Sequence, residues 1–189
     1  MLIDDVRACT ICAEYLPLGP RPIIQIHPNA KILIAGQAPG KKVHETGIPF
    51  DDPSGKRLRE WLGLTKEEFY KPQNVAILPM GFCYPGTGKS GDLPPRPECA
   101  PQWRERLLAL LDKLQLTIVL GTYAQKYHFG KDSSSVTELV KSWRQYWPDK
   151  VPLPHPSPRN NIWLKKNPWF EQELVPELQQ RISVLLQNN

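Results

Sequence analysis

Four short apolar runs, each followed at once by a glycine, proline or histidine break, constrain the fold of this chain more than any other feature. Their length and their β-branched content are typical of strands buried in a sheet. The runs cover residues 32–35, 74–80, 116–120 and 151–154. Residues 23–26 form a further short segment that we expect to be extended.

Segments with helical periodicity separate these runs. Each carries its leucines, valines or tryptophans on one face, as a helix packed on a sheet does. They cover residues 54–63, 102–114, 136–146 and 170–186, and a short helix is expected at 2–13. This alternation predicts an α/β fold, a three-layer sandwich with a mostly parallel central sheet flanked by helices. The loops at Gly36, Gly81, Gly121 and His155 should then share one edge of the sheet, where such folds form their sites.

Composition narrows the class of partner. The chain has 189 residues and a net charge of +5, which is compatible with a polyanionic partner such as DNA. Because no apolar run approaches ~18 residues, we expect no membrane span. The first residues include acids and lack an apolar core segment, so they do not resemble a secretory signal. We therefore expect a cytoplasmic protein.

The four cysteines form a close pair and a distant pair. Two residues separate Cys9 from Cys12. Cys83 precedes the long loop that we expect between residues 87 and 101, and Cys99 lies near the end of that loop. In a reducing compartment such cysteines serve as ligands or thiols more often than as disulfides. The spacing predicts one shared metal site, and all-thiolate ligation suits an iron-sulfur cluster or structural zinc. Four unrelated buried thiols are the alternative.

Three motifs in order resemble the uracil-DNA glycosylase superfamily: GQAPG at residues 36–40, GIPF at 47–50 and HPSPRN at 155–160. The resemblance is closest to the iron-sulfur branch, which also carries four cysteines. It implies a single glycosylase-like domain over residues 1–189 and a [4Fe-4S] cluster, with structural zinc or no metal as alternatives. The implied metal ligands are Cys9, Cys12, Cys83 and Cys99.

The resemblance also implies a role for each motif. Enzymes that excise bases turn the nucleotide out of the duplex and enclose the base in a pocket. His155 would donate a hydrogen bond to the departing base, and fixed donors aimed at developing charge accelerate reactions strongly. The expected base-binding residues are Gly36, Ala38, Phe50 as the stacking wall, and Met80. The expected DNA-binding residues are Lys56, Ser157, Arg159 and Asn160.

The chain departs from the family pattern where water is activated. Family members that use a carboxylate in the first motif have Asp or Glu where this chain has Gln37 and Ala38. Gln37, Asp51 and Asp52 are therefore the candidates that join His155 as catalytic residues. Pro79 occupies the place of the asparagine with which the branch reads its base.

These features predict a monomeric enzyme that hydrolyses the N-glycosidic bond of uracil or another deaminated or damaged base in DNA. Two alternatives remain open at this point. One is a non-catalytic nucleic-acid-binding member of the same fold, and the other is a hydrolase of free nucleosides or nucleotides.

Overall fold

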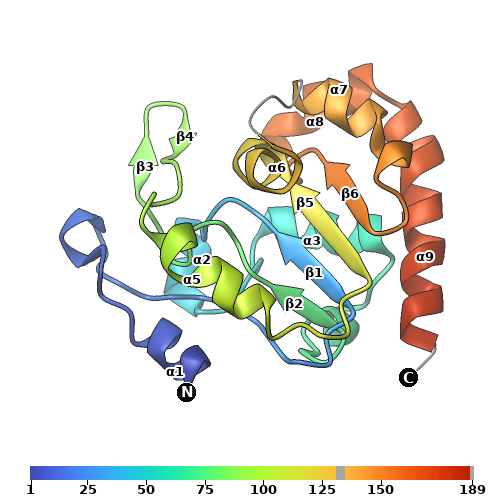
Figure 1. The fold of residues 1–189 in the computed structure, drawn as a ribbon. Coiled ribbons are helices and arrows are strands. Elements are labelled where there is room, and N and C mark those ends of the chain that lie inside the picture. Colours follow the sequence, from blue (N-terminus) through green and yellow to red (C-terminus); the bar gives the residue numbers. More distant parts are fainter. Residues whose placement is uncertain (131–134, 188–189) are drawn as a thin grey trace.

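A four-stranded parallel sheet forms the centre of the computed structural model, which describes residues 1–130 and 135–187 (Figure 1). The strand order is β2-β1-β5-β6, and each neighbouring pair is parallel. The strands are β1 (Ile32–Ala35), β2 (Val75–Ile77), β5 (Leu116–Leu120) and β6 (Lys150–Leu153). The predicted α/β sandwich with a mostly parallel sheet is confirmed.

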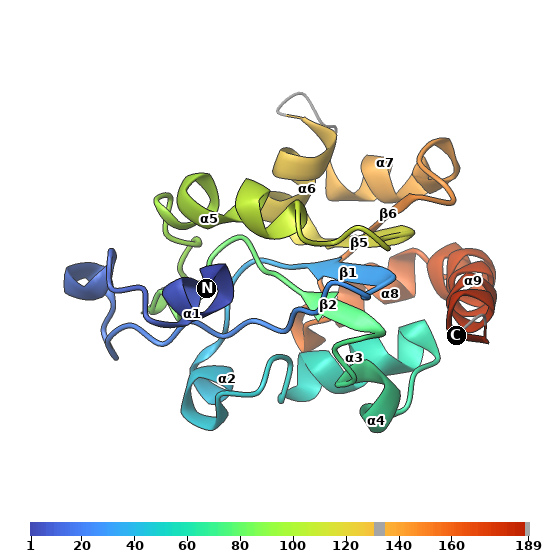
Figure 2. The ribbon, with the colours of Figure 1, turned by 60° about the horizontal axis from the view of Figure 1, so that its bottom comes forward.

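Alternate strand residues pack on opposite faces of the sheet, as the two-residue period of a strand requires. Ile32 and Ile34 lie in one core cluster with α3 (Pro53–Leu62) and α9 (Val175–Gln187). Leu33, between them, packs in another cluster with α1 (Leu2–Arg7) and α5 (Cys99–Leu108). Figure 2 shows α3 and α5 on opposite sides of the sheet. Helices therefore cover both faces.

Shorter elements complete the chain. The remaining α-helices are α2 (Lys41–Thr46), α4 (Lys66–Phe69), α6 (Gly121–Phe129), α7 (Val136–Lys141) and α8 (Asn161–Lys166). Turns of 3₁₀ helix cover Ala13–Tyr15, Trp143–Gln145 and Pro158–Asn160, and a π-helical turn, Phe170–Leu174, leads into α9. No helix within residues 1–130 and 135–187 is long and apolar enough to cross a bilayer.

Several expected segments differ in the structure. The strand expected at 74–80 is limited to Val75–Ile77, and the helix expected at 102–114 is Cys99–Leu108. The helix expected at 2–13 ends at Arg7, and Cys9 and Cys12 follow it outside the helix. Cysteine, threonine and isoleucine, which occupy positions 9–12, are weak helix formers. The break expected at Gly121 is instead the first residue of α6.

The long loop expected at 87–101 contains an antiparallel hairpin of β3 (Thr87–Gly88) and β4 (Gly91–Asp92). Gly91 makes the turn possible because its φ of 130° is rarely adopted by residues with side chains. Figure 1 shows this hairpin standing apart from the central sheet. The last part of the expected loop forms the start of α5.

The strand order places a site at one edge of the sheet. From β1 the chain moves outward to β2 and then returns past β1 to β5, so the direction of winding reverses between β1 and β5. In open parallel sheets, ligands bind beside such a reversal, at the carboxyl ends of the strands. The segments that follow β1, β2, β5 and β6 leave the sheet at this edge, as predicted, although the segment after β5 is the start of α6 and not a loop.

Candidate active site and cysteine cluster

A cavity of about 390 Å³ lies at this edge of the sheet. The loops after β1 and β6, the turn before α3, the end of β2 and the β3–β4 hairpin all contribute to its lining. A volume of this size is within the range of small-ligand sites. The lining includes nine residues proposed from the sequence: Gly36, Gln37, Ala38, Phe50, Asp52, His155, Ser157, Arg159 and Asn160.

Phe50 is held in a strained backbone conformation at the cavity wall. Its φ of 57° falls in the left-handed region, which bulky residues rarely adopt. Gly55 permits this, because a Cβ at that position would lie 1.7 Å from the Phe50 carbonyl oxygen. The tip of the Phe50 ring lies 3.6 Å from where a Cβ of Gly36 would be, and the ring makes an edge-to-face contact with Phe69. Since strain of this kind clusters at functional sites, the ring is a candidate ligand contact.

The protonation of His155 follows from its surroundings. Burial lowers the pKa of His155 below its ordinary value, and the charges of Asp52 and Asp92 act in the opposite direction. The imidazole is therefore neutral near pH 7. The backbone N–H of Ser157 donates to Nδ1 of His155 at 3.2 Å, so Nδ1 is the acceptor and the ring proton resides on Nε2. His155 thus carries a hydrogen-bond donor at Nε2.

Hydrogen bonds hold the loop that carries His155. The Asn160 amide donates to the His155 carbonyl at 2.7 Å, and the Ser157 hydroxyl accepts from the backbone N–H of Arg159. From the basic helix α3, Arg57 donates to the Ser157 carbonyl at 3.2 Å and to the Asn161 side chain at 2.7 Å. These contacts preorganise the loop. No sequence motif indicated that Arg57 would support this loop.

Two carboxylates line the cavity, and only one of them was proposed from the sequence. Asp52 is the N-cap of α3, and its Oδ1 accepts from the Gly55 N–H at 2.8 Å. Asp92 enters from the β3–β4 hairpin. The Thr87 hydroxyl donates to Oδ1 of Asp92 at 3.2 Å. No motif marks Asp92, since its place in the cavity depends on how the hairpin closes onto the loop after β1.

Three residues proposed for the site do not line the cavity. Met80 is 7% exposed and packs in a core cluster with Ala35 and Val119, because the chain after β2 turns its side chain inward. Asp51 closes a turn through its N–H to the Ile48 carbonyl, and only the next residue, Asp52, faces the cavity. Lys56 is exposed on α3.

The four cysteines surround a second cavity, of about 20 Å³, which shares no lining residue with the first. Burial is the main reason that the pKa of Cys83 is raised to about 11 and that of Cys99 to about 12. The charges of neighbouring cysteines add to both shifts, and all four cysteines line the same cavity. Without a bound cation the Cys83 and Cys99 thiols stay protonated at neutral pH.

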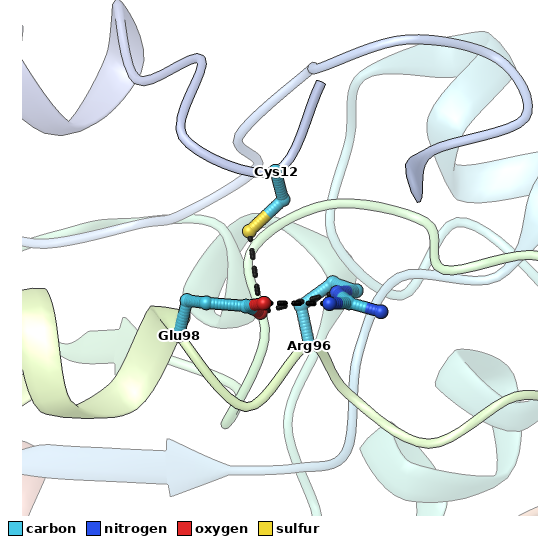
Figure 3. A network of polar contacts seen from close by, with 3 residues as sticks. All are labelled: Cys12, Arg96 and Glu98. Carbon is cyan, nitrogen blue, oxygen red and sulfur yellow. Dashed lines mark hydrogen bonds and ion pairs between the residues drawn. The ribbon is translucent and has the colours of Figure 1, made fainter. Parts of the chain in front are cut away.

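Two of the thiols have hydrogen bonds with other side chains. Cys12 Sγ donates to Glu98 at 3.6 Å, and Glu98 is paired with Arg96 at 2.6 Å (Figure 3). The Trp103 indole N–H donates to Cys9 Sγ at 3.3 Å. The Arg96 guanidinium also lies 4.2 Å from the centre of the Tyr15 ring, and it lines the cavity with Glu98.

The four thiols that line this cavity are suitable ligands for a metal, but their spacing in the structure is not that of a metal site. Four thiols around one cavity are the ligands that iron-sulfur clusters and structural zinc both use. Within residues 1–130 and 135–187, however, no three Cys, His, Asp or Glu side chains have metal-ligand spacing. The cavity has room for about one water-sized group.

Comparisons with known proteins agree with the motifs. The family model described as the uracil DNA glycosylase superfamily matches residues 23–179. A Type-4 uracil-DNA glycosylase of Sulfurisphaera tokodaii is 27% identical over 119 residues, which cover 61% of this chain and 50% of that protein. The chain therefore spans about half the length of this curated relative.

A solved structure has a similar fold. It is the solution NMR structure of a proposed uracil DNA glycosylase from Methanosarcina acetivorans, with a TM-score of 0.50 and 16% sequence identity. The similarity covers 84% of this chain and 94% of that one. At this identity the comparison supports the fold.

Proposed function

Since the chain belongs to the uracil DNA glycosylase superfamily, we propose that it hydrolyses the N-glycosidic bond of uracil or of another deaminated or damaged base in DNA. The observation that carries the proposal is the meeting of Gln37, Phe50 and His155, far apart in the sequence, around one cavity. The base would be turned out of the DNA into this cavity, as enzymes that act on bases require.

His155 and Phe50 have the chemistry that this reaction needs. Breaking the glycosidic bond leaves negative charge on the departing base, and the Nε2–H of neutral His155 would donate to the oxygen where that charge develops. A donor fixed in advance stabilises the transition state without reorganisation. Phe50 would stack on the face of the base, at an angle set by its strained backbone.

DNA would be held by basic and polar groups at the rim of the cavity. Arg159 and Lys56 are exposed, and Ser157 and Asn160 lie beside His155 in the cavity lining. Neutralising phosphates releases counterions, so binding should weaken steeply as salt rises. A hydrolase of free nucleosides would bind its substrate with an affinity that depends little on salt. The salt dependence of substrate affinity therefore distinguishes that alternative from a DNA glycosylase.

The test is a panel of oligonucleotides, each with one uracil, hypoxanthine, xanthine or other damaged base, assayed for base release. His155→Ala should lower release by about 100-fold or more, the usual cost of losing a donor to developing charge. His27→Ala is the matched control, because His27 does not line the cavity. Thermal unfolding of both variants checks that folding is kept. If the wild-type protein releases no base from any lesion, the enzymatic proposal fails.

A non-catalytic binder is the second candidate, and one observation favours it. The first motif has Gln37 in place of an acid, and the Gln37 amide donates to the Leu93 carbonyl at 3.1 Å. An amide cannot accept a proton from water at neutral pH. Tight binding of lesion-bearing DNA without turnover would support this candidate over the glycosylase.

We further propose that Cys9, Cys12, Cys83 and Cys99 hold a metal that ties the amino-terminal segment to α5. The family resemblance favours a [4Fe-4S] cluster, with zinc as the alternative. When bound, the metal would supply folding energy, because its ligands come from separated segments. Iron, sulfide and zinc analysis of purified protein tests this, with Cys83→Ser as the depleted variant. Absence of both metals from freshly purified protein would refute it.

The thiols are all free, which is in keeping with a reducing, cytoplasmic location.

A further inference from the structure

The candidate site needs an acceptor for the proton of the attacking water, and the first motif does not supply one. Gln37 is neutral, and its amide donor is engaged with the Leu93 carbonyl at 3.1 Å. The same contact ties the first motif to the β3–β4 hairpin, one residue beyond Asp92. Gln37 therefore has two features: it replaces the acid that other family members carry in the first motif, and it holds the β3–β4 hairpin at the cavity.

Asp92 is held so that its carboxylate faces the cavity. The Thr87 hydroxyl donates to Oδ1 of Asp92 at 3.2 Å and is itself 2.6 Å from the Tyr84 hydroxyl. Oδ2 lies 3.3 Å from where a Cβ of Gly40 would be, so the absence of a side chain at Gly40 leaves room for it. An ionised carboxylate has about four acceptor sites, and one contact at Oδ1 leaves the others available to water.

A second hydrogen bond holds the hairpin against the loop that carries His155. The Arg159 guanidinium donates to the Ser90 carbonyl, two residues before Asp92. Asp92 is exposed enough to contact solvent, and its negative charge acts on His155. Asp52, the other carboxylate of the cavity, has Oδ1 engaged as the cap of α3. The hairpin that carries Asp92 is therefore held at Leu93 by the first motif and at Ser90 by the His155 loop.

We propose that Asp92 is a further catalytic residue, whose carboxylate orients the attacking water and accepts its proton. This inference rests on the proposed glycosidase function. In the step, the water oxygen forms a bond to the sugar C1′ while the C1′–N bond breaks. The bonding electron pair leaves with the base, the His155 Nε2–H stabilises it, and the water proton passes to Asp92. A hairpin absent from the motif pattern would thus supply the carboxylate that the first motif lacks.

The test compares Asp92→Asn and Asp52→Asn under single-turnover conditions on the best lesion substrate. Asp92→Asn keeps an acceptor oxygen for Thr87, and asparagine at 52 still caps a helix, so both should fold. Asp92→Asn should slow base release by about 100-fold, the lower end of the contribution of a general base, with unchanged affinity for lesion DNA. Asp52→Asn should slow base release less than Asp92→Asn does. Asp112→Asn, an exposed acid outside the cavity, serves as the control.

Chemical rescue separates a catalytic carboxylate from one that only closes the hairpin. Added formate should restore part of the rate of Asp92→Ala, whereas it should not restore His155→Ala. An unchanged rate in Asp92→Asn, or a loss confined to Asp52→Asn, overturns the role of Asp92 while leaving the glycosylase proposal intact. Absence of base release by the wild-type protein overturns both.

Discussion

Lowering the pH from 7 to 5 should destabilise the fold through His128, which lies outside the candidate site. Burial lowers the pKa of His128 from 6.5 to about 3, and the charges of Arg104 and Lys150 add to the effect. Arg104 is 1% exposed, and its Nη2 is 2.8 Å from Nε2 of His128. Since guanidinium is always a donor, Nε2 must be the acceptor, and a proton there would place two cations together.

The magnitude follows from linkage. The unfolded chain protonates His128 as the pH falls below 6.5, whereas the folded chain resists protonation down to about pH 3. The unfolded state therefore binds more protons in this window, and stability falls as the pH falls. At pH 5 the unfolded-state pKa has been passed by 1.5 units, at about 1.4 kcal/mol per unit, so the cost is about 2 kcal/mol.

Urea unfolding of the wild-type protein and His128→Gln at both pH values measures this cost. Glutamine offers an oxygen to Arg104 and does not titrate, so the variant should lose about 2 kcal/mol less than the wild type between pH 7 and pH 5. His27→Gln, which retains the Arg104–His128 contact, should follow the wild type. Equal losses in the wild type and His128→Gln would refute the reasoning, because carboxylates would then account for the whole pH dependence.

Two further changes test the turn before α3. Gly55→Ala places a methyl group 1.7 Å from the Phe50 carbonyl oxygen, so we expect thermal unfolding to show a loss of stability of about 1–3 kcal/mol. Lys56→Ala, on the same helix, should change the stability by no more than about 0.5 kcal/mol. Asp52→Ala removes the cap that accepts from Gly55 at 2.8 Å and should cost about 1 kcal/mol in urea unfolding, whereas Asp51→Ala, which caps nothing, should cost little.

Local pattern was sufficient for the sheet and for the motif loops. The runs at 32–35 and 116–120 are strands with the expected bounds, because a short β-branched run that ends at a glycine is typical of a buried strand. Their alternation with helices also determined that the strands are parallel, which brought His155 and Phe50 to one edge. Helix ends were predicted less well, since weak helix formers after Arg7 depend on packing.

The carboxylates and the protonation of the site were decided by tertiary structure. Asp92 reaches the cavity only because Gln37 and Arg159 latch its hairpin from distant parts of the chain. The Nε2–H of His155 follows from one backbone contact in a folded loop, and the left-handed Phe50 from the space that Gly55 leaves. Periodicity is a property of neighbouring residues, so it specifies strands and helices. Which side chains share a cavity depends instead on contacts between segments that are far apart in the sequence, and no local pattern specifies those contacts.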